Sequence, residues 1–102
     1  MADPNDPSKP LAGAEAKRRA LAIFDTGTVE FPPYSMRRLE ERDITTQDTE
    51  NTLKGGVFQF AEWNYQYQEN RYRFETSRMG VVIAFDSDDE TLLTVVTTWR
   101  KT

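Results

Sequence analysis

The stretch GVVIAFDSDDETLLTVVTTW, residues 80–99, decides the fold of this chain. Two apolar runs, 80–85 and 92–96, flank the acidic segment 87–90. β-Branched and aromatic residues favour strands, and a short polar segment between two such runs is typical of a hairpin tip. Because both runs are apolar at successive positions, we expect them to be covered on both faces or to lie mostly buried. These residues therefore predict two central antiparallel strands.

Upstream segments extend this sheet, because they are rich in aromatic residues and separated by turns. They are VFQFAEW (57–63), YQYQ (65–68) and YRFETSRM (72–79). We expect Asn70 to mark the turn between the second and the third segment, and Arg78 to lie at a turn before Gly80. With the two central strands, the carboxy-terminal half predicts a meander of about four antiparallel strands.

The amino-terminal half follows helical periodicity in short pieces. The first piece, AEAKRRALAIF at 14–24, should stop near Gly27 and places four apolar residues on one face, Ala16, Ala20, Ile23 and Phe24. The segment TVEFPP is then a short extended connection, because proline disfavours helical dihedrals in the residue before it. A second helix is expected to begin at residue 33 or 34.

In this second helix Tyr34, Arg38 and Arg42 share one stripe, while Met36 and Leu39 are expected to approach the core. A third helix should be capped by Thr45 or Thr46 and should stop at Gly55–Gly56.

The pattern as a whole predicts one α+β domain over residues 13–102, with N-terminal short helices packed on a C-terminal antiparallel sheet. Residues 1–12 contain prolines mixed with Asp, Asn and Ser, and we expect them to form a disordered tail.

Composition narrows the chemistry that this chain can perform. Among its 102 residues there is no cysteine and no histidine, which excludes disulfides, thiolate metal sites and a Ser-His-Asp triad. No metal or other cofactor is expected. The 13 basic and 17 acidic residues give a net charge of −4, which argues against a dedicated non-specific nucleic-acid binder but allows a local basic site. No apolar run approaches the roughly 18 residues of a membrane span, so we expect a cytoplasmic protein without membrane contacts.

The segment FPPYSMRRLEERDITTQDTENTLKGGV at 31–57, followed by YRFET, GVVIAF and LLTVVTTWRK, resembles bacterial proteins with the DUF4258 pattern. The resemblance covers about residues 20–101 and rests on the order and spacing of these segments. That family looks related to the RelE-like toxins, especially the MqsR and BrnT branches, which cleave RNA and pair with antitoxin proteins. It implies helices on one side of an antiparallel sheet and an RNA groove on the other. Tyr34 and Asp43 depart from the pattern, which commonly has His and Gly there.

RNA cleavage without a metal needs a group that accepts the 2′-hydroxyl proton, one that stabilises the phosphorane and one that protonates the leaving oxygen. The resemblance to RelE-like enzymes implies that Lys, Arg and Tyr serve these roles in a chain without histidine. The residues of those types that match are, as catalytic candidates, Tyr34, Arg73 and Arg100 and, as RNA-binding candidates, Arg38, Arg42, Arg71 and Lys101.

The stretch NRYRFETSR, residues 70–78, divides by strand alternation. Arg71 and Arg73 should point to one side, and Tyr72 and Phe74 to the other, into the core. The planar guanidinium donates two hydrogen bonds at once to a phosphate and keeps its charge. Arg71 and Arg73 are therefore the candidate phosphate-facing pair.

Each candidate also has a purely structural alternative. Arg71 and Arg73 can pair across or along strands with glutamates, namely Glu62, Glu69 or Glu75. Tyr34 can be an aromatic residue at the edge of the core. Arg38 and Arg42 can form ion pairs with Glu41 and Asp43, and Arg100 and Lys101 can be solvated charges.

The aromatic run WNYQYQ adds a further alternative, since Trp63, Tyr65 and Tyr67 should alternate onto one strand face. Such a face can stack bases, anchor a protein partner or pack in the core. Two functions therefore stay open. One is an RNA-cleaving toxin that acts on single-stranded RNA and pairs with a protein antitoxin. The other is a non-catalytic binding, immunity or regulatory protein on the same fold, with another protein partner.

Overall fold

The computed structural model describes residues 4–6 and 8–101. Within this part the chain forms an α+β fold of three helices and five strands. In chain order the elements are α1 (Gly13–Thr26), β1 (Thr28–Glu30), α2 (Pro33–Glu41), α3 (Thr46–Gly55), β2 (Val57–Asn64), β3 (Glu69–Glu75), β4 (Met79–Phe85) and β5 (Leu92–Arg100).

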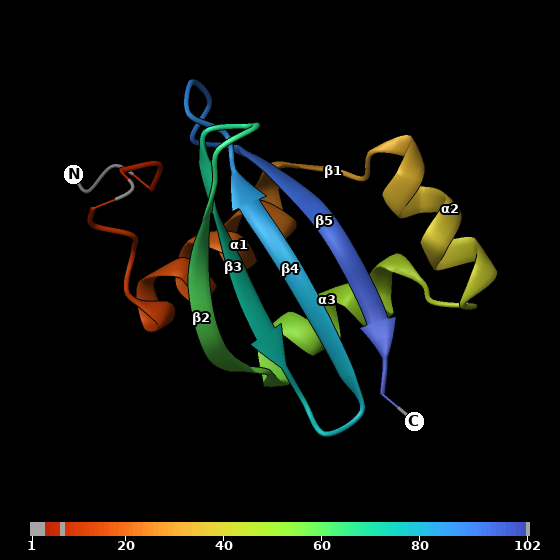
Figure 1. Ribbon diagram of the computed structural model, residues 1–102. Helices are drawn as coiled ribbons and strands as arrows, with labels where there is room; N and C mark the ends of the chain where they lie inside the picture. Colours follow the sequence, from red (N-terminus) through yellow and green to blue (C-terminus); the bar gives the residue numbers. More distant parts are fainter. Residues whose placement is uncertain (1–3, 7, 102) are drawn as a thin grey trace.

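All the strands belong to one sheet with the order β1-β5-β4-β3-β2 (Figure 1). Strands β2 to β5 form an antiparallel meander, and β1 pairs with β5 in parallel. The prediction that 80–85 and 92–96 are interior strands is confirmed, because β4 lies at the middle of the sheet and β5 has a neighbour on each side.

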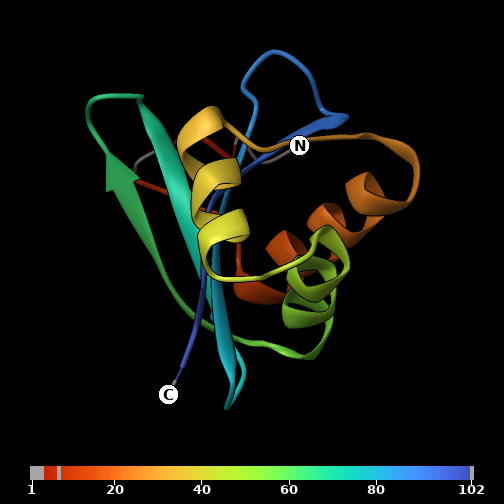
Figure 2. The same ribbon diagram turned by 90° about the vertical axis from the view of Figure 1, so that its right-hand side faces the viewer.

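Two helices, α1 and α3, cover one face of the sheet, whereas α2 lies along β5 at the sheet's edge (Figures 1 and 2). The core between the two helices and the sheet contains Ala16, Ala20 and Ile23 from α1, as their helical spacing predicts. From the sheet it contains Tyr72, Phe74, Val81, Ile83, Phe85, Leu93 and Val95. The opposite face of the sheet, called the open face below, carries no helix in front of β3 and β4 (Figure 1).

The sequence did not predict β1, which we expected to be a connection. Its residues Thr28–Glu30 pair with Leu92–Thr94 of β5. Three residues are too few to show an alternating pattern, and their pairing depends on a strand more than sixty residues away. The parallel edge strand makes the sheet mixed rather than purely antiparallel.

The prediction of a strand at 65–68 with a turn at Asn70 is wrong. Residues 65–68 form the turn between β2 and β3, and Asn70 lies within β3. The side-chain oxygen of Asn64 accepts a hydrogen bond from the Tyr67 N–H at 2.9 Å, and Gln68 has a left-handed φ of 51°. These local features close the hairpin at residues 65–68, so β3 has already begun at Glu69 when the chain reaches Asn70. The stripe of Trp63, Tyr65 and Tyr67 on one strand face is therefore absent.

The helix ends follow their capping residues. Helix α1 ends at Thr26, and the Gly27 N–H donates to the Ile23 carbonyl at 2.7 Å. Helix α3 begins with a capping box between Thr45 and Asp48, in which each side chain accepts from the other residue's backbone N–H. The hydrogen bonds from Thr45 lower the pKa of the Asp48 carboxyl. These boundaries confirm the predicted extents of both helices.

Helix α2 faces the sheet with a different set of residues than predicted. Leu39 is buried as expected, but Met36 is 43% exposed. Ser35, a polar residue at the same helix end, is buried instead and its hydroxyl donates to the Val96 carbonyl at 2.5 Å. A hydrogen bond to a strand carbonyl therefore fixes the rotation of α2, which a count of apolar residues does not reveal.

The segment expected to be a disordered tail makes specific contacts where the structure describes it, while residues 1–3 and 7 lie outside the described part. Leu11 is 3% exposed in the core. The Pro4 carbonyl accepts hydrogen bonds from the Asn70 side chain at 2.9 Å and from the Tyr72 hydroxyl at 3.2 Å. The Leu11 N–H donates to the same hydroxyl at 2.9 Å. This segment satisfies buried polar groups of β3, so it belongs to the packed domain.

Candidate functional site

Strand β3 divides its side chains between the core and the open face. Asn70, Tyr72 and Phe74 are at most 2% exposed on the helix side. The alternating residues Arg71 and Arg73 are half-buried on the open face, together with Glu69 and Glu75. The predicted split of NRYRFETSR is confirmed, because strand alternation decides it.

Arg73 is held by two aromatic rings and one carboxylate. Its guanidinium carbon lies 4.4 Å from the ring centre of Trp99 and 5.7 Å from that of Phe60. Its Nε donates to Glu75 at 2.6 Å, and Lys101 pairs with the same carboxylate at 2.6 Å. The hydrogen bonds from Lys101 and then Arg73 lower the pKa of Glu75. The arginine is therefore fixed in orientation before any ligand arrives.

Arg71 repeats this arrangement two residues earlier. Its Nε pairs with Glu69 at 3.1 Å, and its guanidinium carbon lies 5.2 Å from the ring centre of Tyr67. Among the residues that the structure describes, no hydrogen bond engages the terminal Nη groups of either arginine. Both side chains thus present a free two-nitrogen fork to the open face.

Residues of β4 and β5 form the surface beside Arg73 and Glu75. Arg73, Val82 and Thr97 are neighbours across β3, β4 and β5, and so are Glu75, Gly80 and Trp99. A Cβ atom on Gly80 would overlap the Trp99 ring, so the glycine leaves the space in which this ring contacts Arg73. The glycine and the tryptophan together form the support under the guanidinium.

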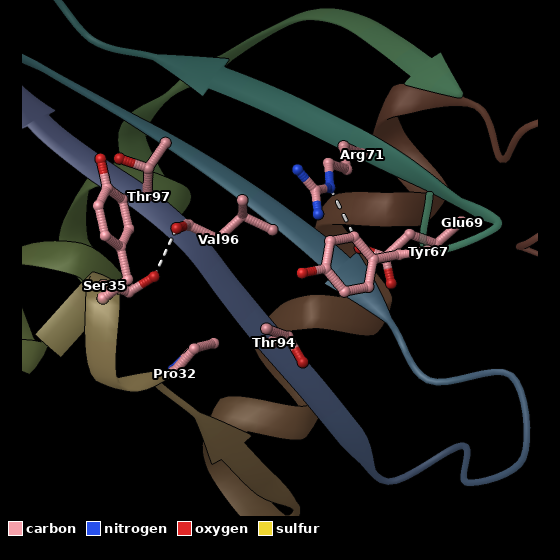
Figure 3. A pocket seen from close by; sticks show the side chains of 9 residues that line it. Pro32, Ser35, Tyr67, Glu69, Arg71, Thr94, Val96 and Thr97 are labelled. Atoms are coloured by element: carbon pink, nitrogen blue, oxygen red, sulfur yellow. Dashed lines mark hydrogen bonds and ion pairs between the residues drawn. The ribbon is translucent and has the colours of Figure 1, made fainter. Parts of the chain in front are cut away.

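A hollow of about 680 Å³, called the large hollow, lies on the open face between α2 and β3 (Figure 3). In Figure 3, Arg71, Glu69 and Tyr67 lie on one side, Pro32 and Ser35 on the other, and β5 runs between them. An extra residue in β5, Val96, comes between the partners of Ile83 and Val82 and lines this hollow. The lining residues are Pro32, Tyr34, Ser35, Tyr67, Glu69, Arg71, Thr94, Val96 and Thr97.

Tyr34 brings a phenol to the wall of the large hollow, and Arg38 contacts it one helical turn later. The Arg38 Nη2 donates to the Tyr34 hydroxyl oxygen at 2.7 Å, and its guanidinium carbon lies 5.0 Å from the ring centre. The predicted stripe of Tyr34, Arg38 and Arg42 is confirmed for its first two members. Arg42 follows the last residue of α2 and donates to the Thr98 carbonyl. Tyr34 is 61% exposed and is an edge residue rather than a core residue.

Arg42 and Arg100 lie elsewhere and contact backbone. The Arg42 Nη1 donates to the Thr98 carbonyl at 2.8 Å. Arg100 donates to the carbonyls of Asp43 and Arg42 at 2.6 and 3.3 Å, and it lies 3.9 Å from Asp48 at the start of α3. Together they fasten the loop between α2 and α3 to the end of β5.

Arg73 and Arg100 do not come together, although both were catalytic candidates. Arg100 pairs with Met79, whose sulfur contacts Thr52 of α3, so this register position faces the helices. Arg73 faces the other side of the sheet. The structure instead brings Tyr34 and Arg71 to one hollow, and Arg38 donates to the Tyr34 hydroxyl. Arg73 lies two residues from Arg71 on β3, and Lys101 shares the Glu75 carboxylate with Arg73.

Sequence reasoning missed the aromatic supports Phe60 and Trp99 and the hollow's polar lining from Ser35, Thr94 and Thr97. The contact of Phe60 with Arg73 depends on an irregularity of β2 between Phe58 and Phe60, which breaks simple alternation. The sequence contains one signal for Trp99: it lies two residues after Thr97, so the two side chains point to the same face of a strand. Which residues of the neighbouring strands they contact follows only from the strand register.

Within residues 4–6 and 8–101, no group of three or more acidic side chains is placed to hold a metal ion, and no helix is long and apolar enough to cross a membrane. Fold and site together define an α+β protein with an arginine- and aromatic-lined hollow on the open face of its sheet. No family model, no curated protein and no solved structure matches this chain.

Proposed function

We propose that this chain is a metal-independent ribonuclease of the toxin type that acts on single-stranded RNA on the open face of its sheet. One observation supports this most. The large hollow is lined both by Tyr34, whose hydroxyl contacts a permanent cation, and by Arg71, whose terminal nitrogens are free. A proton-transfer group and a phosphate-binding group therefore border the same space.

The proposed reaction is attack of a ribose 2′-oxygen on the adjacent phosphorus. The phenolate form of Tyr34, with the Arg38 Nη2 donating to its oxygen at 2.7 Å, accepts the 2′-hydroxyl proton. The Arg71 fork binds the non-bridging oxygens and stabilises the phosphorane. The bond from phosphorus to O5′ then breaks, and the proton held by Tyr34 passes to O5′. The products are a cyclic 2′,3′-phosphate and a free 5′-hydroxyl.

Arg73 takes a binding role in this proposal, next to Arg71 on the same strand face. Arg100, which the sequence offered as catalytic, is left out because its guanidinium is used on the helix side by the carbonyls of Arg42 and Asp43. Arg42 is likewise assigned to holding α2 against β5.

A second candidate function is a non-catalytic protein-binding module, for which an antitoxin-like or other protein would be the partner. The observation in its favour is the charge balance of the open face. Glu69 and Glu75 neutralise Arg71 and Arg73, and Lys101 also pairs with Glu75. Arginine and large aromatic residues are frequent anchors of protein interfaces.

One experiment separates the two functions. Purified protein is incubated with single-stranded RNA in excess chelator, and the fragments and their end groups are analysed. The ribonuclease proposal predicts cleavage that Tyr34→Phe reduces by about 100-fold or more, the usual range for loss of proton transfer. Arg37→Ala, an exposed change on α2, is the matched control. Intact RNA with wild-type protein, together with a defined protein partner that Arg71→Ala releases, would favour the binding module.

A further inference from the structure

The open face has a second hollow that joins the large one. This small hollow, of about 200 Å³, is lined by Phe60, Glu62, Arg71, Arg73, Val82, Val96 and Thr97. It shares Arg71, Val96 and Thr97 with the large hollow. Because these residues of β3 and β5 line both hollows, we treat the two hollows as one groove, with Arg71 where they meet.

Arg71 can bind an anion where the two hollows meet. Glu69 occupies only its Nε, and Tyr67 lies against the guanidinium plane. Its free Nη groups are donors, and they can satisfy an oxyanion with two parallel hydrogen bonds. A ligand that spans both hollows therefore binds most tightly when its single negative charge lies at Arg71, where the hollows meet.

Each hollow offers an aromatic ring on its wall. Tyr34 and Tyr67 line the large hollow and are 61% and 62% exposed, and Phe60 lines the small hollow and is 45% exposed. Exposed rings of this kind stack planar groups such as bases. The groove thus presents ring, cation, ring in sequence.

We infer that the groove takes a two-nucleotide segment of single-stranded nucleic acid, with one base in each hollow and the joining phosphodiester on Arg71. The inference rests on the proposed function and adds its footprint, which means the number of nucleotides bound and the position of each in the groove. Arg73 lies two residues along β3, about 6.6–6.8 Å further, and its fork meets the next phosphate of a longer strand. The rings of Phe60 and Trp99 hold the Arg73 guanidinium in this position.

Charge favours this occupant over an acidic peptide. Two carboxylates line the groove, Glu62 and Glu69, and Glu62 stands opposite Arg71 in the strand register. A third, Glu75, pairs with Arg73. A peptide with closely spaced carboxylates would meet these glutamates, whereas a nucleotide segment places a neutral planar base on each side of one charge. The alternation of ring and cation in the groove matches the alternation of base and phosphate.

The test uses 2′-deoxy dinucleoside monophosphates, which lack the attacking hydroxyl and so report binding without cleavage. Their affinity is measured by calorimetry beside that of the deoxynucleoside and of the same dinucleotide with a neutral methylphosphonate linker. The inference predicts that the natural dinucleotide binds about tenfold tighter than either comparison ligand. Arg71→Ala should remove this advantage and leave the methylphosphonate ligand's affinity unchanged.

Further variants locate the two bases. Phe60→Ala should weaken the dinucleotide by about fivefold or more, and Tyr67→Ala should do the same. Glu62→Gln should tighten dinucleotide binding, because it removes a negative charge opposite Arg71. Arg37→Ala serves as the control, and thermal unfolding confirms that each variant is folded.

The outcomes separate this inference from the proposed function. If dinucleotides bind as predicted but RNA stays intact, the footprint holds and the ribonuclease proposal fails. If RNA is cleaved but the dinucleotide binds no tighter than the nucleoside, or Arg71→Ala affects charged and neutral linkers equally, the footprint is wrong. Binding of a glutamate-rich peptide in place of the dinucleotide would also overturn it.

Discussion

At the scale of single residues, β3 joins the core to the groove by alternation alone. Tyr72 and Phe74 anchor the strand against the helices, and Arg71 and Arg73 stand between them on the other face. Because core packing fixes the backbone, the arginines hold their positions without ligand. Their neighbours Glu69 and Glu75 fix the orientation of each guanidinium through Nε.

Gly80→Ala tests the support under Arg73. The added methyl group overlaps the Trp99 ring, so the ring must move and leave the guanidinium. We expect the free energy of unfolding to fall by about 1–3 kcal/mol, as for other overpacked sites. Urea denaturation measures this change.

Gly55→Ala is the matched control for this change. The nearest atom to its new Cβ is the Thr76 Cγ2 at 3.9 Å, an ordinary contact distance. We expect little or no fall in the free energy of unfolding for Gly55→Ala. Equal losses at Gly55 and Gly80 would show that the Trp99 contact does not depend on glycine.

Glu75 makes stability depend on pH in a defined direction. Its pKa is lower in the folded protein than the ordinary value of 4.5, because Lys101 and Arg73 stabilise the carboxylate. As pH falls below 4.5, the unfolded chain takes up the proton first, and the stabilisation is lost until the folded carboxyl also titrates. Glu75→Gln should therefore lose less stability than wild type over this acidic window.

Denaturation midpoints measured at steps from neutral to acidic pH check this expectation. Glu40→Gln, a change of an exposed residue on α2, provides the comparison. An identical acid dependence in wild type and Glu75→Gln would contradict the role given to the pair of cations.

At residue scale, much of the open face could be predicted from the sequence. The alternation of side chains along a strand was enough to predict that Tyr72 points into the core and Arg71 to the open face. The support of Arg73 by Phe60 and Trp99 could not be predicted, because it joins β2, β3 and β5 across an irregular register. The position of Arg100 was also beyond reach, since its partners are backbone carbonyls of a loop nearly sixty residues earlier.

At the scale of elements, the amino-terminal segment and β3 depend on each other. The Asn70 side chain is 2% exposed and donates to the carbonyls of Pro4 and Asp6. Asn70→Ala should lower the free energy of unfolding by about 1–3 kcal/mol, because each of these carbonyls loses one hydrogen-bond donor and the buried amide is removed. Calorimetric unfolding tests this.

A deletion of residues 1–10 should lower stability as well, since the Asn70 side chain then loses both acceptors. Asn51→Ala, at an exposed position on α3, is the control for a loss of asparagine. Unchanged stability in both Asn70→Ala and the deletion would mean that the segment is only loosely attached.

The loop between α2 and α3 stores a local strain at Asp43. This residue has a φ of 53°, in the left-handed region that glycine adopts without cost. Arg100 holds the loop through the Asp43 carbonyl, which does not depend on the side chain. Asp43→Gly should therefore be more stable than Asp43→Val by about 1–2 kcal/mol, as urea denaturation would measure. Equal stability of the two variants would contradict a requirement for this backbone conformation.

The helices were the most predictable elements. Capping residues at Thr45, Asp48 and Gly27 are local signals, and they gave the correct ends of α1 and α3. The short strand β1 and the turn at 65–68 were mistaken, because the first depends on a distant partner and the second on the side chain of Asn64.

At the scale of the whole molecule, the one-sided cover of the sheet creates the groove. Helices α1 and α3 cover one face and α2 stands at the edge, while no helix of the described chain covers the open face between α2 and β2 (Figure 2). The α+β class followed from the order of helical and strand patterns. The groove itself did not, since it arises from the position of α2 relative to β5 and from the extra residue Val96.

The claim that the groove is the functional site has one most direct measurement. Single-stranded RNA is incubated in chelator with wild type, Tyr34→Phe and Arg71→Ala, with Arg37→Ala as the control. The account predicts cleavage by wild type and control, with products ending in cyclic phosphate, and a loss of about 100-fold or more in the two groove variants. Intact RNA with folded wild-type protein, or equal rates in wild type and Tyr34→Phe, would contradict it.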